Sequence, residues 1–238
     1  MRVRSSVSRG ERMSSRWQAV IPLVIFCALG GLAACGDHDT ERVDSTTTAL
    51  PPEVRAQALW PDVESVTRFD DPVEAARSFA VDLVGFTDPV LGEFRQGDSR
   101  SGEVELQPRA GGPVSIVLLR QLAPDETWWV LAAVHEDIVI EKPQPRSVID
   151  HPLRLSGRAR AFEGTVQVSI LADGSPDPIG EGFVTGSGGL DLGPFDGEIP
   201  FQTPQVDWGA LVLYTESAED GSVWAVTAIR VGFLGDTD

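Results

Sequence analysis

Cysteine, histidine and lysine are scarce in this sequence. Two of the 238 residues are Cys and three are His, and Lys142 is the only lysine. Cys27 lies inside an apolar run that we expect to be removed, so no disulfide framework can hold the folded part together. A tetrahedral zinc site would lack ligands, because no histidine lies in a His-x-x-x-His or cysteine-rich setting. The formal net charge of −17 repels phosphate groups and argues against a nucleic-acid partner.

Motifs for nucleophilic or phosphate chemistry are also absent. The sequence has no Gly-x-Ser-x-Gly elbow and no glycine-rich loop followed by lysine, and the Gly-Ser-Gly-Gly run at 186–189 is not set between a strand and a helix. Among the histidines, His38 and His151 lack a catalytic setting. His135, followed by Glu136 and Asp137, falls in a predicted turn, where we expect a solvated side chain. We therefore predict a protein that is not an enzyme and that has no cofactor and no metal.

Carboxylates gather at two places in the second half of the chain. Calcium could use such oxygens, but neither group has the spacing of an EF-hand loop. Asp-Gly and Glu-Asp-Gly are common in turns, which is the reading we favour, with calcium as the alternative. The two groups are Asp191, Asp196 and Glu198, and Glu216, Glu219 and Asp220.

The first 34 residues have the three parts of a secretory signal. Five arginines precede an apolar segment at 19–29, and Pro22 and a Gly-Gly pair argue against a permanent membrane helix. The segment ends in Leu32-Ala33-Ala34-Cys35, which resembles a bacterial lipobox. That resemblance implies cleavage before Cys35 and a lipid on its side chain, which would hold the protein on the extracytoplasmic face of the cell membrane. The alternative is an ordinary signal peptide that happens to contain a cysteine.

A polar segment, 35–58, follows and shows no apolar periodicity. We expect it to be a flexible acidic tether with His38 in solvent. The mature chain would keep about 200 residues, enough for two small domains.

Residues 59–143 predict a small α+β domain, with one main helix packed on an antiparallel sheet. Asp71 is placed to cap a helix that begins at Pro72 and ends at Gly85. Strand patterns follow at 103–107, 114–122, 128–134 and 138–140. Adjacent strand residues face opposite ways, so one ring of the pair Trp128 and Trp129 should be buried and the other could anchor a ligand.

Residues 144–238 predict an immunoglobulin-like β-sandwich, because short strands recur with turns between them. The strand patterns are at 153–156, 165–170, 179–185, 195–201, 210–217 and 223–233. Without a cysteine pair the core must rest on packing. We expect that core to contain Phe162, Phe183, Phe195, Phe201, Leu213 and Trp224.

Four pieces of this second half carry a resemblance to a known family. They are Pro-Leu-Arg-Leu-Ser-Gly-Arg-Ala at 152–159, Phe-Glu-Gly-Thr-Val at 162–166, Ile-Leu-Ala-Asp-Gly at 170–174, and Ser-Ala-Glu-Asp-Gly-Ser at 217–222. In this order they resemble Gmad2, an immunoglobulin-like domain of bacterial spore germination and other surface proteins. The resemblance implies a structural and interaction module without catalytic residues. Its frequent companion, the GerMN domain, is not recognisable in 59–143.

Together these features predict a non-enzymatic, lipid-anchored protein that binds or scaffolds an envelope protein. The alternative is an envelope ligand sensor or hydrolase with a pocket in the 59–143 domain. A cleft that gathers Glu103, Glu105 or His135 would favour this alternative, whereas a closed core near the helix would argue against it. A further possibility is that the sandwich is only a spacer.

Overall fold

The computed structural model describes residues 50–122 and 126–234. The signal segment, Cys35 and His38 lie outside these residues. Residues 50–58, which the sequence assigns to the tether, are folded: helix α1 (Pro52–Arg55) buries Val54, and Leu50 and Ala58 are buried beside it. Among the described residues, no helix is long and apolar enough to cross a membrane.

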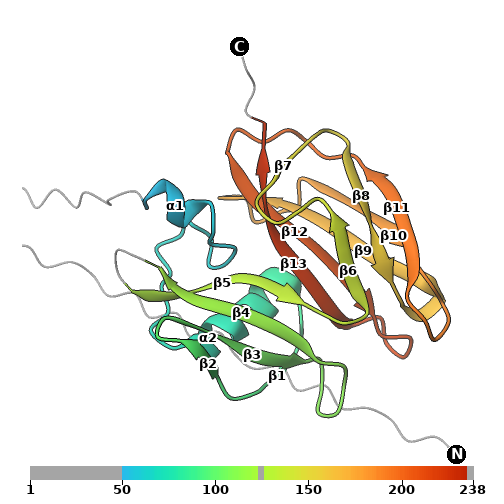
Figure 1. Cartoon of the computed structure of the whole chain (residues 1–238), viewed down its shortest axis with the longest axis horizontal. Helices are drawn as coiled ribbons and strands as arrows, with labels where there is room; N and C mark the ends of the chain where they lie inside the picture. The colour runs from blue at the N-terminus through green and yellow to red at the C-terminus, as the bar shows by residue number, and fades with distance from the viewer. Residues whose placement is uncertain (1–49, 123–125, 235–238) are drawn as a thin grey trace, which may run out of the picture. The chain divides into compact units, whose positions relative to one another are not determined.

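Antiparallel β-sheets make up most of the described chain (Figure 1). The larger sheet has ten strands, eight of them in the order β1-β3-β4-β5-β13-β12-β9-β10, with β2 beside β3 and β7 beside β13. Its strands are β1 (Val90–Leu91), β2 (Arg95–Asp98), β3 (Ser101–Gln107), β4 (Ser115–Leu122), β5 (Thr127–Val134), β7 (Val148–Ile149), β9 (Thr165–Ala172), β10 (Gly180–Thr185), β12 (Trp208–Glu216) and β13 (Val223–Phe233). The smaller sheet has the order β11-β8-β6 and contains β6 (Ile138–Lys142), β8 (Leu153–Ala159) and β11 (Gly193–Ile199).

Helix α2 (Pro72–Ser78) lies against β3, β4 and β5. It begins as the sequence predicts, because an Asp71 side-chain oxygen accepts hydrogen bonds from the backbone N–H groups of residues 73 and 74 at 2.8 and 3.0 Å. The helix continues as a π-helical segment, η1 (Phe79–Val84), and stops at Gly85, whose φ of 92° suits glycine. The π-helical turn was not predicted.

The Trp128–Trp129 pair does point to opposite faces of β5, but neither ring is free. Trp129 is fully buried in a cluster with Leu50 and Val54 of the α1 segment. Trp128 is half-buried and stands edge-on to Phe94 with the ring centres 4.9 Å apart. The expectation of an outward ring available to a ligand is therefore wrong, because the α1 segment covers the face that the sequence left open.

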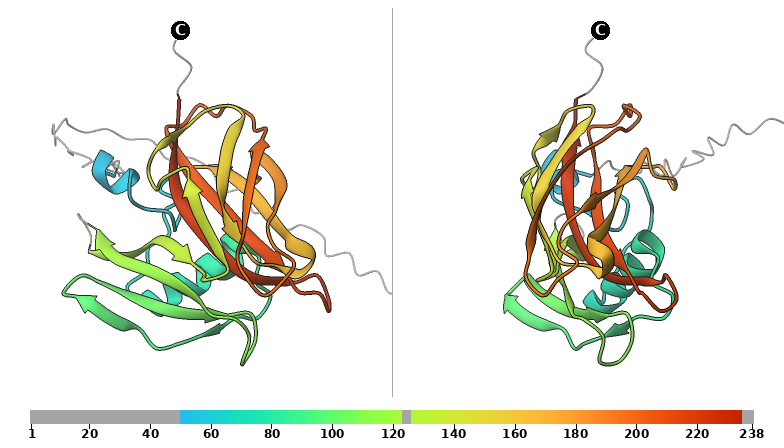
Figure 2. Two further views of the ribbon diagram at one scale, coloured as in Figure 1. Left: turned by 45° about the vertical axis from the view of Figure 1, so that its right-hand side comes forward. Right: turned by 90° about the vertical axis from the view of Figure 1, so that its right-hand side faces the viewer.

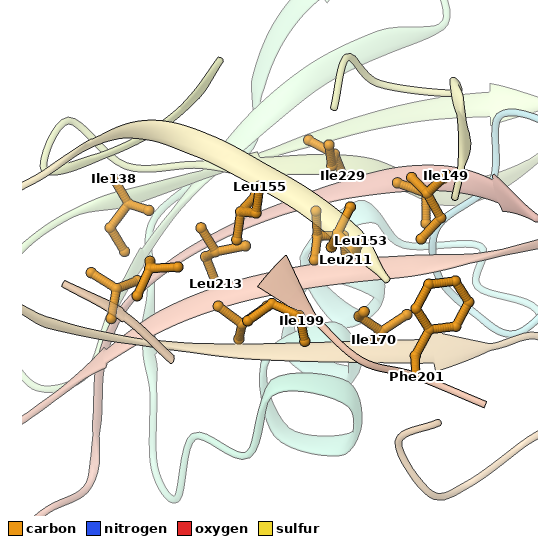
Figure 3. Packing of buried hydrophobic residues seen from close by; sticks show 14 of the residues in the cluster. Ile138, Ile149, Leu153, Leu155, Ile170, Ile199, Phe201, Leu211, Leu213 and Ile229 are labelled. Carbon is orange, nitrogen blue, oxygen red and sulfur yellow. The ribbon is translucent and has the colours of Figure 1, made fainter. Parts of the chain in front are cut away.

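The sandwich core lies between the smaller sheet and the strands β13, β12, β9 and β10 of the larger one (Figures 2 and 3). Alternate residues of each strand enter it, and Figure 3 shows Leu155, Leu213 and Ile199 meeting there from three strands. The predicted core residues Phe195, Phe201 and Leu213 are buried.

Three other predicted core residues are not buried. Phe162 and Phe183 are 62% and 64% exposed, and Trp224 is half-buried. Phe183 faces outward because its neighbour Val184 occupies the inward position on β10. Phe162 lies on a turn between two strands, where no second sheet covers it.

Strand β6 belongs to the sandwich, although the sequence pattern groups 138–140 with the preceding domain. It pairs with β8, with Ile138 opposite Ala159 and Ile140 opposite Gly157. The chain crosses between the two halves before β6 and not only at the Pro-Gln-Pro break at 143–145.

The two halves of the described chain share one sheet and belong to one compact unit. Strands β5 and β13 are joined through Ala132 opposite Ile229 and Ala133 opposite Ala228. We call this junction the seam. The two parts that the sequence predicts therefore share one continuous sheet. The seam extends on both sides of these two residue pairs, wherever residues of the two halves meet.

Candidate functional site

A cavity of about 430 Å³ opens at the seam, and we call it the seam cleft. One wall comes from the β3–β4 connection and the end of β5, and the other from turns of the sandwich and the start of β13. Its lining residues are Arg109, Pro113, His135, Asp137, Arg160, Ala161, Phe162, Gly188, Gly189, Thr215, Glu216, Ser217, Ala218, Glu219, Trp224 and Ala225. A second hollow, lined by Arg158, Leu190 and Asp191 among others, shares Asp137 and Arg160 with it.

His135 forms part of the cleft wall and is 5% exposed, so the prediction of a solvated turn residue is wrong. Its backbone N–H donates to Thr227 Oγ1 at 3.0 Å, and that hydroxyl donates to the Ile138 carbonyl at 2.9 Å. These two bonds fix the β5–β6 turn against β13. Burial of the imidazole lowers the pKa of His135, against the opposing effect of Asp137.

The hydrogen-bond partner of the His135 ring determines which ring nitrogen carries the proton. Nδ1 accepts the backbone N–H of Asp137 at 3.0 Å, so the neutral ring carries its proton on Nε2. In the described chain, no serine, threonine or cysteine side chain hydrogen-bonds to this imidazole, and Ser217 Oγ instead accepts the Glu219 N–H. The arrangement offers a neutral donor to a bound molecule and does not form a nucleophile–base pair.

Two arginines of the cleft are paired with carboxylates. Arg160 lies 2.5 Å from Asp137 and donates to the Leu190 carbonyl. Arg109 lies 2.9 Å from Glu219, with its guanidinium 4.9 Å from the centre of the Trp224 ring. Both positive charges are therefore compensated within the cleft, which leaves little attraction for an anion.

A strained turn holds Phe162 at the cleft. Glu163 has φ 54° and ψ 12°, Gly164 has φ 76°, and the N–H of residue 165 donates to the Phe162 carbonyl. This is the pattern of a type I′ turn that joins β8 to β9. A side chain at Gly164 would lie 2.9 Å from the carbonyl of Gly186, whose own N–H donates to the Gly164 carbonyl. The turn and the 186–189 loop thus support each other, and Phe162 is presented outward on a fixed backbone.

The carboxylates that the sequence singles out are divided between places. Glu216 and Glu219 line the cleft, and Asp191 lines the neighbouring hollow. Asp220 caps its own turn, because it accepts hydrogen bonds from the Ser222 hydroxyl and backbone N–H. These hydrogen bonds also lower the pKa of Asp220. Within the described residues, no three His, Cys, Asp or Glu side chains form a group that could hold a metal ion, so the calcium alternative gains no support.

The remaining predicted residues lie elsewhere. Asp196 and Glu198 are on β11, where Glu198 is 3.5 Å from Arg154. Glu103 and Glu105 are on β3 beside Arg95 and do not join His135. His151 packs edge-on against Phe201. The cavity that contains His135 is therefore a feature of the seam and not a pocket inside the 59–143 segment.

Comparison with known proteins concerns the second half of the chain. Residues 137–222 match the family model described as the immunoglobulin-like domain of bacterial spore germination, Gmad2. This match confirms the resemblance found in the sequence. It begins early enough to include β6, which agrees with the pairing of that strand in the sandwich. No curated protein and no solved structure matches the chain.

Sequence reasoning missed that Phe162 is exposed and lines the cleft. It placed Phe162 in the core because aromatic residues are usually buried. The available signal was the Glu-Gly pair that follows it, since glycine favours the positive φ of a tight turn and a residue at such a turn need not follow the alternation of a strand. Arg109 and Arg160 carried no comparable signal, because their cleft is assembled from segments far apart in the chain.

Proposed function

We propose that this is a non-enzymatic, lipid-anchored protein on the extracytoplasmic face of the cell membrane, and that it binds an envelope protein through the seam cleft. In this proposal the α+β module that ends before β6 and the immunoglobulin-like sandwich that begins with β6 form one binding body. The lipobox-like Leu-Ala-Ala-Cys sequence supports lipid attachment at Cys35. The observation that carries the binding role is the cleft itself, with the exposed Phe162 held over it on a fixed turn.

Two properties of the cleft favour binding of a protein. Both halves of the chain contribute to the walls of the cleft, so a bound partner would contact both halves, and its affinity would depend on how they are arranged. An exposed aromatic ring on a rigid backbone loses little conformational freedom when it is covered, and such residues dominate many protein interfaces. This argues against a sandwich that serves only as a spacer.

The anchor is tested with the two cysteines. We expect Cys35→Ala to abolish incorporation of labelled palmitate and to release the protein from the membrane fraction. Cys27→Ala is the matched control and should leave both unchanged. Retention of label and membrane association by Cys35→Ala would contradict the anchor.

The binding role is tested by crosslinking in cells. p-Benzoylphenylalanine placed at residue 162 is expected to give a discrete protein adduct on irradiation. The same residue at 183 is the control, since Phe183 is equally exposed but lines no part of the cleft. Equal adducts at both positions, or none at 162, would overturn the proposal.

A ligand sensor is the second candidate, because the cleft volume of about 430 Å³ lies in the range of small-molecule sites and His135 offers a donor there. In that case the dialysable fraction of an envelope extract should raise the melting temperature of the wild type but not of Phe162→Ala. A hydrolase finds less support, since the cleft has no nucleophile–base pair.

A further inference from the structure

The chemistry of the seam cleft narrows the kind of partner. We infer that it binds a basic protein segment that carries an aromatic or large aliphatic anchor between arginines or lysines. This inference rests on the proposed function. It follows from the apolar side chains presented at the cleft, from the uncompensated negative charge around them, and from the pairing of Arg109 and Arg160 inside the cleft with carboxylates.

The apolar contact is made by two side chains on connected loops. Leu190 is 87% exposed and lies in the hollow next to the cleft that Phe162 overhangs. The loops that carry them are joined by hydrogen bonds from the Ala161 N–H to the Ser187 carbonyl and from the Arg160 guanidinium to the Leu190 carbonyl. Phe162 and Leu190 thus lie on two hydrogen-bonded loops, and the hollows that they line share Asp137 and Arg160. A segment with one large apolar residue could cover both.

The charge around these groups is negative. Asp137 and Glu219 are compensated by Arg160 and Arg109. Other acidic side chains remain along the cleft, the second hollow and the turns beside them, and of the described arginines that line the two hollows only Arg158 is not paired with Asp137 or Glu219. The acidic side chains are Glu136, Glu163, Asp191, Glu216 and Asp220. Positive residues on either side of an apolar anchor would complement this rim, and the attraction would speed association.

Other ligand chemistries fit less well. An anion would have to displace Glu219 or Asp137 from its arginine. A saccharide needs an open aromatic face on which to stack, but the Arg109 guanidinium covers Trp224. The uncovered ring is Phe162, which protrudes from a turn and suits insertion against an apolar side chain.

The test uses the full chain as purified from cells and a random twelve-residue peptide library displayed on phage. We expect the enriched peptides to contain Trp, Phe or Leu flanked by Arg or Lys. A synthetic peptide of the enriched sequence should bind about tenfold or more weakly to Phe162→Ala, and with unchanged affinity to Phe183→Ala. Raising NaCl from about 50 to 300 mM should weaken its binding severalfold.

The role of charge is tested with a matched pair of double variants. Glu136→Gln with Asp191→Asn removes two negative charges beside the cleft, and Glu181→Gln with Asp196→Asn removes two from strands that do not line it. Only the first should weaken the peptide. Equal effects, or enrichment of neutral or acidic peptides, would overturn the basic partner. So would binding of arrayed glycans without any peptide.

The two proposals fail in different ways. If residue 162 crosslinks to a protein in cells but the enriched peptides are not basic or ignore Phe162→Ala, the chemistry inferred for the partner is wrong and the binding role stands. If residue 162 gives no adduct, the binding role itself fails.

Discussion

Strand β13 meets the first half of the chain in opposite ways at its two ends. Near one end, Arg230 is fully buried, donates to both oxygens of Asp173 at 2.6 Å, and reaches the carbonyl of Arg55. Near the other end, Trp224 and Ala225 line the open cleft, where the Arg109–Glu219 pair is exposed. We call the first the closed end of the seam.

The same arginine–carboxylate chemistry therefore serves two purposes. The side chains of Arg230 and Asp173 are 2% and 7% exposed, and those of Arg109 and Glu219 are 59% and 70% exposed. Breaking a buried pair costs several kcal/mol because a charge is left without water or a partner, whereas an exposed pair contributes about 0–1 kcal/mol. At the closed end, the Arg230–Asp173 pair lies within the sandwich and holds the guanidinium that donates to the Arg55 carbonyl of the first half. At the cleft end, the Arg109–Glu219 pair joins the two halves and stays exposed.

The largest effect should come from breaking the closed end. Asp173→Asn keeps the shape of the side chain but leaves the Arg230 charge uncompensated, so we expect a loss of about 3–5 kcal/mol in the free energy of unfolding by urea. The control is Glu198→Gln, which breaks the exposed pair with Arg154 and should cost no more than about 1 kcal/mol. Equal losses would show that burial does not separate the two pairs.

A smaller loss in the free energy of unfolding is expected from Thr227→Val, in the middle of the seam. The change keeps the volume but leaves the His135 N–H and the Ile138 carbonyl without their partner, which should cost about 1–3 kcal/mol. Thr185→Val on the exposed side of β10 is the matched control and should be nearly neutral. If the two variants unfold at the same urea concentration, the hydroxyl bridge does not stabilise the seam.

Local signals in the sequence predicted most elements of the fold. Asp71, Pro72 and Gly85 bound the helix as expected, because capping depends on neighbouring residues. Strand alternation located the main strands of the sandwich. It did not reveal the joining of β5 to β13, because that contact involves only two residue pairs and residues far apart in the chain.

The cleft was less predictable for the same reason. His135 looked like a turn residue, and its burial depends on segments far apart in the chain, among them β13, where Thr227 accepts its backbone N–H. Phe162 looked like a core residue, since hydrophobicity does not distinguish a strand position from the residue before a tight turn. The signal that located the proposed anchor at Cys35 is again a short contiguous motif, outside the described residues.

The free energy of unfolding should also depend on pH, because His135 is buried on the cleft side of the seam. Burial lowers the pKa of His135 in the folded protein below the usual value of 6.5, which applies to the unfolded chain. Below pH 6.5 the unfolded state binds more protons, and stability should fall until the folded ring also titrates, by about 1.4 kcal/mol for each unit of pKa difference.

Urea unfolding between pH 7.5 and 5.5 checks this dependence. His135→Gln should flatten the fall in stability relative to the wild type. The nearby charges of Glu136, Asp137 and Arg160 stay unchanged in this variant. An undiminished slope in His135→Gln would assign the pH effect to other groups.

The smallest expected change in the free energy of unfolding comes from the turn beside the cleft, where one substitution should raise stability and weaken binding. Glu163 holds a left-handed conformation that costs a non-glycine residue about 1–2 kcal/mol, while glycine adds about 0.5–1 kcal/mol of flexibility to the unfolded chain. Glu163→Gly should therefore raise the free energy of unfolding by up to about 1 kcal/mol, whereas Glu181→Gly on extended β10 should lower it by about that amount. The more stable variant should bind the enriched peptide more weakly, because the freer turn no longer fixes Phe162. Stability and affinity that rise together would mean that the strain at Glu163 plays no part in presenting the ring.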